Sequence, residues 1–259
     1  MLLSDLNIVR AAHIILASAS PRRSAILNEQ LGLNVRVVPS SFAEDLDQSA
    51  FASASLYCEA TAREKALQVY DKCTPPFMSK HGHPPSLVVG ADTVVVVDGQ
   101  ILEKPACMDG ARAMLRQLSA AGTHTVCTAV SLIYGSTEAG VEPYEHTFSE
   151  ETTVTFRALS DEEIETYVAT GEPMDAAGSY AIQGLGGTLV SGISGDYLNV
   201  VGFPMSRFCS ELDTNRLTTW IAAAVSNEVA APSSTADDGN LVVNELLCKD
   251  EDECGMPSD

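Results

Sequence analysis

Leu87 to Pro105, LVVGADTVVVVDGQILEKP, is the stretch that decides the fold. It begins with an apolar run rich in β-branched valine, which is typical of a strand buried on both faces. Asp92 interrupts this run just after Gly90. We therefore expect Asp92 to lie where the chain leaves the sheet and its side chain can face an open cleft.

Beyond Asp92 the same stretch predicts a hairpin. A second valine run, Val94–Val97, is followed by the turn pair Asp98-Gly99 and then by the apolar pair Ile101-Leu102. The hairpin ends in Glu103-Lys104-Pro105. An acid and a base border one small sheet unit, and this arrangement favours the handling of a charged ligand.

The charge balance of the chain excludes some partners. The 259 residues carry a formal net charge of −20, of which nine Asp or Glu against one Lys in residues 222–259 contribute −8. Such acidity argues against binding to nucleic-acid polymers or to anionic lipid, since both need a basic face. It does not exclude a basic pocket.

Cysteine usage and hydropathy indicate the compartment. Seven cysteines, an odd number with no CxxC pair, favour free thiols in a reducing compartment without structural zinc. The apolar patch before Pro21 is interrupted by Asp5, Arg10 and His13, which argues against a signal peptide. No stretch reaches the roughly 20 apolar residues of a membrane span. We expect a soluble, cytoplasmic protein without a membrane partner.

The N-terminal part predicts an anion site. The apolar strand 13–17 runs into Ser18-Ala19-Ser20-Pro21-Arg22-Arg23, where Ser20 is a good N-cap and Pro21 suits the first helical position. Helix N-termini offer unpaired N–H groups and positive partial charge, so two arginines there favour anion binding. A capped helix with solvated arginines is the alternative.

The next segments supply an acid and a base. A short strand around 35–37 leads into an acidic loop, in which Glu44 or Asp45 is a candidate metal ligand; solvated loop acids are the alternative. A helix follows, whose face is predicted to be Leu56, Ala60, Arg63, Leu67 and Tyr70, with Lys65 off that face. Prolines and HGH in residues 74–86 predict a surface loop, although His81 and His83 are candidate metal ligands.

The second half predicts alternating helices and strands. We expect a helix over 109–118 capped by Asp109, a long strand over 123–134, and a strand over 152–157 that pairs with it antiparallel. Ser160 and Glu163 form a capping box for a helix that ends near Gly171. The glycine-rich segment 174–202 is typical of a close backbone approach or of loops between short strands. Pro204 opens a last helix through Leu212 that extends toward Trp220.

Six separated motifs carry a family resemblance. SASPRR, AREKA, GADTVVVVDGQILEKP, THTVCTAV, SYAIQGLGG and NVVGFP occur in this order between His13 and Leu212. In them the chain resembles the Maf family of nucleotide pyrophosphatases, and within it the branch that hydrolyses dTTP and UTP. That branch has Arg, Thr and Gln at the positions of Arg22, Thr93 and Gln183, all of which are present here.

The resemblance implies a fold and a reaction. The fold is an elongated α/β protein of the Maf/ITPase type, with a mixed twisted sheet flanked by helices and two lobes with a cleft between them. In the reaction, water activated by a divalent metal attacks the α-phosphorus of a nucleoside triphosphate and releases pyrophosphate and the monophosphate. Mg²⁺ is the expected metal, with Mn²⁺ as an alternative, and a homodimer is the expected assembly.

The resemblance also implies a role for each site residue. Asp92 is the general base or the ligand that positions the metal, and Glu44 shares the metal with it. Gln183, which donates and accepts at once, suits a pyrimidine edge. The phosphate chain and the charge on the leaving pyrophosphate are assigned to a set of hydroxyl and cationic side chains, namely Ser18, Ser20, Arg22, Arg23, Lys65 and Lys104.

One position departs from the family pattern. The family commonly has lysine before the Ala-Gly that precedes the YxIQ motif, whereas this chain has Ala176. A substrate contact or an ion pair is missing at that place if the lysine normally makes one.

Three parts of the chain and three candidate functions follow. The parts are an N-terminal extension over 1–12, a Maf-like domain over 13–221 and an acidic tail over 222–259 that we expect to be disordered. The leading hypothesis is a dTTP/UTP pyrophosphatase that also accepts modified pyrimidine nucleotides. The alternative is a nucleotide-binding regulatory protein linked to cell division without significant catalysis, and a weaker one is an interaction protein whose tail binds basic partners.

Overall fold

The computed structural model of the chain describes residues 6–81, 87–135, 143–214, 217–219, 221–222 and 226. The strands are β1 (Ile14–Ala17), β2 (Val35–Val37), β3 (Leu87–Val97), β4 (Gln100–Leu102), β5 (Thr123–Tyr134), β6 (Tyr144–Phe156) and β7 (Val190–Ser194). The α-helices are α1 (Leu6–Arg10), α2 (Pro21–Ala25), α3 (Ala54–His81), α4 (Met108–Ala121), α5 (Asp161–Ala169), α6 (Tyr197–Val201) and α7 (Met205–Thr214). Short π and 3-10 segments are η2 (Ile26–Gln30), η3 (Gln48–Ala50), η4 (Glu172–Asp175), η5 (Ala177–Ser179) and η6 (Leu185–Leu189).

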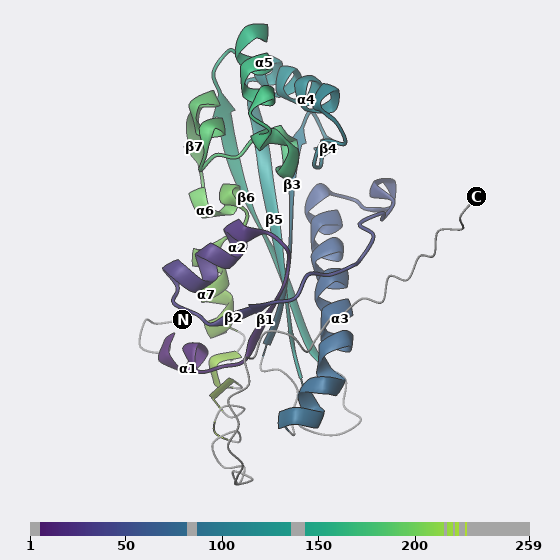
Figure 1. Cartoon of the computed structure of the whole chain (residues 1–259), viewed down its shortest axis with the longest axis vertical. Coiled ribbons are helices and arrows are strands. Elements are labelled where there is room, and N and C mark those ends of the chain that lie inside the picture. The colour runs from purple at the N-terminus through teal and green to yellow at the C-terminus, as the bar shows by residue number, and fades with distance from the viewer. Residues whose placement is uncertain are drawn as a thin grey trace, which may run out of the picture.

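The strands form one mixed seven-stranded sheet, which confirms the predicted fold class. Their order is β2-β1-β3-β5-β6-β7, with β4 paired to β3. β1 runs parallel to β2 and β3, whereas β3, β5, β6 and β7 are antiparallel to their neighbours in turn. The molecule is elongated because β3, β5 and β6 run along its long axis, with α4, α5 and β7 gathered at one end (Figure 1).

Strand β3 corrects the predicted position of Asp92. β3 is one continuous strand, and Asp92 pairs with Ala129 of β5 in its middle instead of lying where the chain leaves the sheet. The ladder continues past the acid because an ion pair compensates its charge, as described below, and because β-branched residues follow it. The hairpin prediction is confirmed: β3 pairs with β4, and Asp98 and Gly99 both have positive φ, 50° and 76°, as a tight two-residue turn requires.

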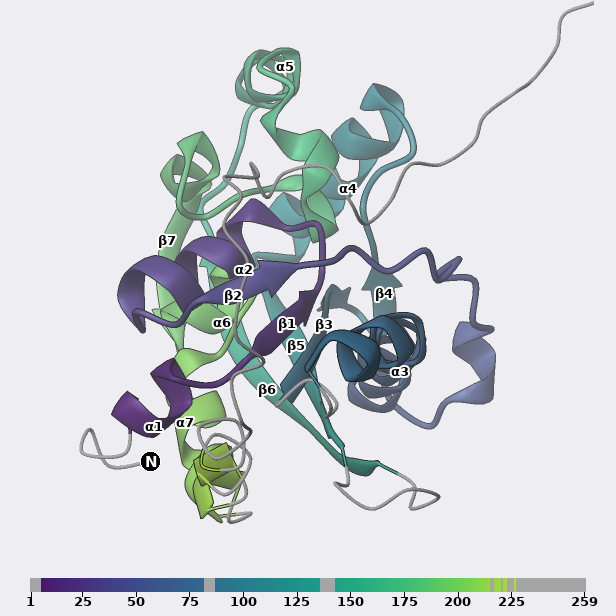
Figure 2. The ribbon, with the colours of Figure 1, turned by 60° about the horizontal axis from the view of Figure 1, so that its bottom comes forward.

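The two faces of the sheet are covered by different helices. Side chains alternate along β1, so that Ile14 and Leu16 pack in one cluster with α1, η2 and α7, whereas Ile15 and Ala17 pack in another with α3. Figure 2 shows α3 on one side of the strands and α1, α2 and α7 on the other. Both faces of the first strands are therefore buried, as their continuous apolar sequences predict.

Helix α3 corrects a predicted face. The buried residues Tyr57, Ala62, Lys65 and Val69 lie one position or more away from the predicted stripe, and Leu56, which belonged to that stripe, is 48% exposed. The physical reason is that α3 approaches the sheet closely at Gly90, where the small residues Ala62 and Ala66 face the strand. The helix also extends to His81 through the first part of the predicted loop, while His83 lies outside the described residues.

Most predicted helix ends are confirmed. Ser20 caps α2 with Pro21 in its first turn, and Ser160 and Glu163 form the predicted capping box of α5. The predicted cap of α4 is wrong: Cys107 is the cap, and its Sγ accepts from the N–H of Gly110. The predicted antiparallel strand pair is β5 with β6, and β6 begins earlier than expected.

The ends of the chain bear on the predicted division into parts. Leu6 and Val9 of α1 are buried in the core, so the segment predicted as an extension contributes to the core from Leu6 onward. Trp220 and the predicted acidic tail lie outside the described residues, except for Ala222 and Ser226. In the part of the chain that the structure describes, no helix is both long and apolar enough to cross a membrane.

Candidate active site

A cleft of about 580 Å³ lies where α2, the middle of β3, the segment after β4 and the segment 175–183 meet. Its volume is within the range of small-molecule sites in proteins. All ten side chains predicted for the site line this one cleft: Ser18, Ser20, Arg22, Arg23, Glu44, Lys65, Asp92, Thr93, Lys104 and Gln183. The structure thus brings these side chains, which come from separate sequence motifs, together in one place.

A lysine between two carboxylates forms the base of the cleft. The Nζ of Lys65 lies 2.8 Å from Oδ1 of Asp92 and 2.8 Å from Oε2 of Glu44. The side chains of Lys65 and Asp92 are 9% and 10% exposed, whereas that of Glu44 is 55% exposed. The ammonium group compensates a buried carboxylate, which would otherwise be costly to bury.

The packing of α3 on β3 creates this arrangement. A Cβ on Gly90 would lie 2.3 Å from the carbonyl oxygen of Ala62, so only glycine allows α3 to approach this part of β3. Side chains two residues apart in a strand share a face, so Asp92 points toward α3 as Gly90 does. Lys65, one turn beyond Ala62 on the helix, then reaches the carboxylate.

The second oxygen of Asp92 is also engaged. The Sγ of Cys58 lies 3.6 Å from Oδ2 of Asp92 and 3.6 Å from the carbonyl oxygen of Cys127. Burial raises the pKa of the Cys58 thiol, so it stays protonated and can donate a hydrogen bond. The orientation of Asp92 is therefore fixed from two sides by residues of α3.

The two neighbouring arginines differ in their surroundings. Arg23 donates through Nε to the Gly202 carbonyl, through Nη1 to Ser18 Oγ and the Ala91 carbonyl, and through Nη2 to Thr93 Oγ1, each at 2.9 Å. A guanidinium has five N–H groups, and the protein already occupies four of those of Arg23. Burial lowers the pKa of Arg23. Arg23 thus joins α2, β3 and the turn after α6, and one N–H remains for a ligand.

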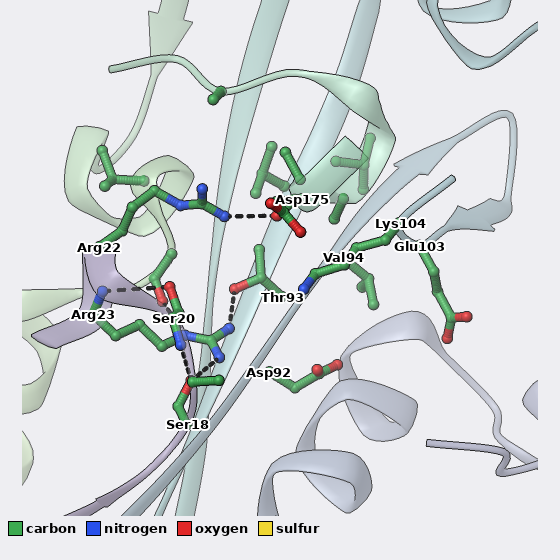
Figure 3. A pocket seen from close by; sticks show the side chains of 18 of the residues that line it. Ser18, Ser20, Arg22, Arg23, Asp92, Thr93, Val94, Glu103, Lys104 and Asp175 are labelled. Carbon is green, nitrogen blue, oxygen red and sulfur yellow. Dashed lines mark hydrogen bonds between the residues drawn. The ribbon is translucent and has the colours of Figure 1, made fainter. Parts of the chain in front are cut away.

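Arg22 and Lys104 approach the cleft from separate segments (Figure 3). Nη2 of Arg22 donates to the carbonyl oxygen of Asp175 at 2.9 Å, which leaves most of its donors available. Lys104 follows β4, is exposed, and has no ion-pair partner among the described residues. These two cations are better placed than Arg23 to meet an anionic ligand.

The two carboxylates at the base of the cleft are ligands of the kind that Mg²⁺ prefers. Within the described residues no group of three or more His, Cys, Asp or Glu side chains could hold a metal ion by itself. Mg²⁺, however, is commonly held by one or two carboxylates while substrate phosphates and water supply the other ligands. Glu44 and Asp92, brought together on Lys65, fit that mode.

Some residues of the site were not predicted. Glu103 lines the cleft and accepts a hydrogen bond from the Tyr57 hydroxyl, and Ala176 and Tyr180 form part of the wall. The hairpin motif pointed to Glu103 as a charged border residue, but Tyr57 carries no sequence signal because its partner is 46 residues away. At Ala176, the departure from the family pattern leaves a buried methyl group in the wall.

Comparisons with known proteins agree with the motifs. A family model described as "Maf-like protein" matches residues 13–215. A human protein named "Probable bifunctional dTTP/UTP pyrophosphatase/methyltransferase protein" is 46% identical over 77% of this chain, but the chain spans only 31% of that protein's length. A "dTTP/UTP pyrophosphatase" of Halalkalibacterium halodurans is 43% identical over 80% of this chain and 97% of its own.

A fungal relative and a solved structure complete the comparison. The "dTTP/UTP pyrophosphatase" of Schizosaccharomyces pombe is 42% identical over 74% of this chain and 79% of its own length. The crystal structure of a nucleoside-triphosphatase / dITP/XTP pyrophosphatase from Mycobacterium abscessus is 16% identical over 56% of this chain and 74% of its own, with a TM-score of 0.31. That structural likeness is too weak to support any statement about the cleft.

Proposed function

This chain belongs to the Maf-like protein family, and we propose that its cleft hydrolyses dTTP and UTP to the monophosphate and pyrophosphate. Relatives that are 42% to 46% identical over 74% to 80% of this chain carry that activity in their names. Modified pyrimidine nucleotides are further candidate substrates.

The observation that carries this proposal is the base of the cleft. The Nζ of Lys65 lies 2.8 Å from a carboxylate oxygen of Asp92 and of Glu44. Arg22 and Lys104 line the same cleft. A triphosphate carries about four negative charges, and each cation at about 4 Å contributes on the order of 4 kcal/mol at an effective dielectric of about 20, before desolvation. An acidic protein can therefore hold a triphosphate in this one place.

In the reaction, a water oxygen forms a bond to the α-phosphorus while the bond from that phosphorus to the bridging oxygen of the β-phosphate breaks. Asp92 accepts the proton of the water or, in the alternative role, holds the metal that positions the water. Lys65 keeps the carboxylate in place, and Arg22 and Lys104 stabilise the charge that develops on the leaving pyrophosphate. The proton finally leaves to solvent.

A divalent metal, Mg²⁺ first and Mn²⁺ second, is part of this proposal. Glu44 and Asp92 would hold it together with the phosphates of the substrate. When bound, the metal supplies Lewis-acid polarisation and neutralises phosphate charge. Removal of divalent ions with a chelator is expected to abolish turnover, and return of Mg²⁺ to restore it.

We also propose the cytoplasm as the compartment and a homodimer as the assembly. In the part of the chain that the structure describes, Cys58, Cys107 and Cys127 have free thiols, which supports a reducing compartment. The dimer is proposed from the family resemblance. Sedimentation of the purified chain tests it directly: a monomeric mass at micromolar concentration would contradict the dimer.

The enzymatic reading is tested with Asp92→Asn. Wild-type protein is screened against nucleoside triphosphates, including methylated ones, with detection of pyrophosphate. We expect turnover of dTTP and UTP with little product from ATP, and a collapse of turnover in the variant while it still binds nucleotide. The matched control is Asp98→Asn at the hairpin tip, where asparagine tolerates the positive φ of 50°. Binding without turnover in the wild type would favour the regulatory alternative, and unchanged turnover in D92N would contradict the role of Asp92.

A further inference from the structure

Glu172 in η4 binds the backbone of the turn that carries Gln183. Its Oε1 accepts from the Tyr167 hydroxyl and from the Gly186 N–H, both at 2.8 Å, and its Oε2 accepts from the Leu185 N–H at 3.0 Å. Burial disfavours the ionised carboxyl, but these hydrogen bonds outweigh it and lower the pKa of Glu172. The carboxylate therefore holds the C-terminal half of the turn at neutral pH.

Tyr167 of α5 holds the other half of the same turn. Its side chain is buried, with the residue 6% exposed, and its hydroxyl oxygen accepts from the Ala181 N–H at 3.1 Å. The single hydroxyl proton of Tyr167 is donated in a hydrogen bond to Glu172, so the hydroxyl oxygen can act only as an acceptor toward the Ala181 N–H. The two side chains form one unit that binds both ends of the turn.

The glycines of the turn show that it is built around this pair. A Cβ on Gly184 would lie 2.4 Å from Oε2 of Glu172, and a Cβ on Gly186 would lie 2.6 Å from the Tyr167 hydroxyl. Any larger residue would push the pair and the turn apart. The close approach thus accounts for Gly184 and Gly186, two of the three glycines of the GLGG motif.

Gln183 lies between the two anchored ends. It lines the cleft and is exposed, and its amide has no hydrogen-bond partner among the described residues. The location of this amide therefore depends on the turn and not on contacts of its own. An amide that reads a nucleobase edge must keep its donor and acceptor in a fixed orientation, since a misplacement of about 1 Å can cost about a hundredfold in rate.

We infer that Glu172 and Tyr167 are positioning residues for Gln183 and set how strictly the cleft selects the base of its substrate. This inference rests on the proposed function. The phosphate chain is assigned to Arg22, Lys65 and Lys104, which lie outside this turn, although Arg22 meets η4 at the Asp175 carbonyl. Weakening the pair should therefore change base selection while phosphate binding stays intact.

The test compares Tyr167→Phe and Glu172→Gln with the wild type. Y167F removes one oxygen atom, and E172Q turns one acceptor into a donor that faces the Leu185 N–H. We expect the ratio of kcat/KM for UTP over CTP to fall about tenfold in each variant, mainly through KM for UTP. Inhibition by tripolyphosphate, which has no base, should remain within about twofold of the wild type. Glu165→Gln, on α5 but paired with Arg112, is the matched control and should change neither quantity.

A double-mutant cycle with Gln183→Ala separates positioning from general destabilisation. If the pair acts through Gln183, Y167F adds no further loss of selectivity in the Q183A background. A full additional loss there, or wild-type selectivity in both Y167F and E172Q, would overturn the inference. Absence of dTTP and UTP turnover in the wild type would instead overturn the proposed function. Y167F is the milder change, so it decides the outcome if E172Q fails to fold.

Discussion

At the scale of single residues, His124 links stability to pH. It is 4% exposed, its Nε2 lies 2.8 Å from the Tyr180 hydroxyl, and its Nδ1 has no hydrogen-bond partner among the described residues. Burial lowers the pKa of His124 to about 4, whereas an unfolded histidine titrates near 6.5. Because the unfolded state binds the proton more tightly, stability is complete above about pH 6.5 and falls as the pH drops toward 4.

We predict that His124→Gln removes this dependence. The variant loses aromatic contacts with Phe156 and Tyr180 and is less stable at pH 7, but its deficit relative to the wild type should shrink by about 3 kcal/mol between pH 7 and pH 4. Urea unfolding at several pH values measures this. His13→Gln at an exposed position is the control, and a constant deficit across the range would refute the prediction.

The two arginines of α2 provide a second prediction at this scale. Arg23→Gln removes most of four hydrogen bonds and should lower the free energy of unfolding by about 2 to 4 kcal/mol. Arg22→Gln removes one bond to a carbonyl and should change stability by less than about 1 kcal/mol, while KM for UTP rises about tenfold. Chemical denaturation and steady-state kinetics distinguish them, and equal stability of both variants would contradict the structural role of Arg23.

At the scale of elements, the contact between α3 and β3 determines the geometry of the site. Gly90→Ala would place a methyl group 2.3 Å from the Ala62 carbonyl oxygen and 2.7 Å from the Ala66 Cβ. We predict a loss of about 1 to 3 kcal/mol in stability, together with a loss of activity because Lys65 moves away from Asp92. Thermal unfolding and turnover measure the two effects. Gly192→Ala, whose Cβ would contact only Thr155 at 3.9 Å, is the control and should be neutral.

The same elements show what the sequence could and could not predict. Local signals such as the Ser20 cap, the Ser160–Glu163 capping box and the Asp98-Gly99 turn act within a few residues, and the structure confirms each. The prediction of the buried face of α3 was wrong because the close approach at Gly90 selects the small residues Ala62 and Ala66, which apolar periodicity does not identify.

Contacts distant in sequence limited the prediction of the site. Motifs identified which side chains belong to the cleft, but not that Lys65 lies between Glu44 and Asp92, or that Arg23 is mostly occupied by the protein. The pairing of Tyr167 with Ala181 and of Glu172 with Gly186 also depends on how separate segments meet. No pattern in one segment encodes such contacts.

At the scale of the whole molecule, the cleft is assembled from residues between Ala17 and Gly202. We predict that a chain truncated after Ala230 keeps kcat and KM for UTP within about twofold of the full chain, since the residues that line the cleft are retained. Steady-state kinetics on both chains measures this. Lost activity in a truncated protein with a wild-type melting temperature would show that the tail takes part in catalysis.

The long paired strands β3, β5 and β6 run beneath the cleft without a break in the β3–β5 and β5–β6 ladders. Because bending such a floor would break many backbone hydrogen bonds at once, a hinge through it is too costly to operate in each catalytic cycle. Above the sheet, the Arg22 guanidinium joins α2 to η4 through a single hydrogen bond to the Asp175 carbonyl. A triphosphate that draws this guanidinium to itself would break that one bond and leave the strand ladders unchanged.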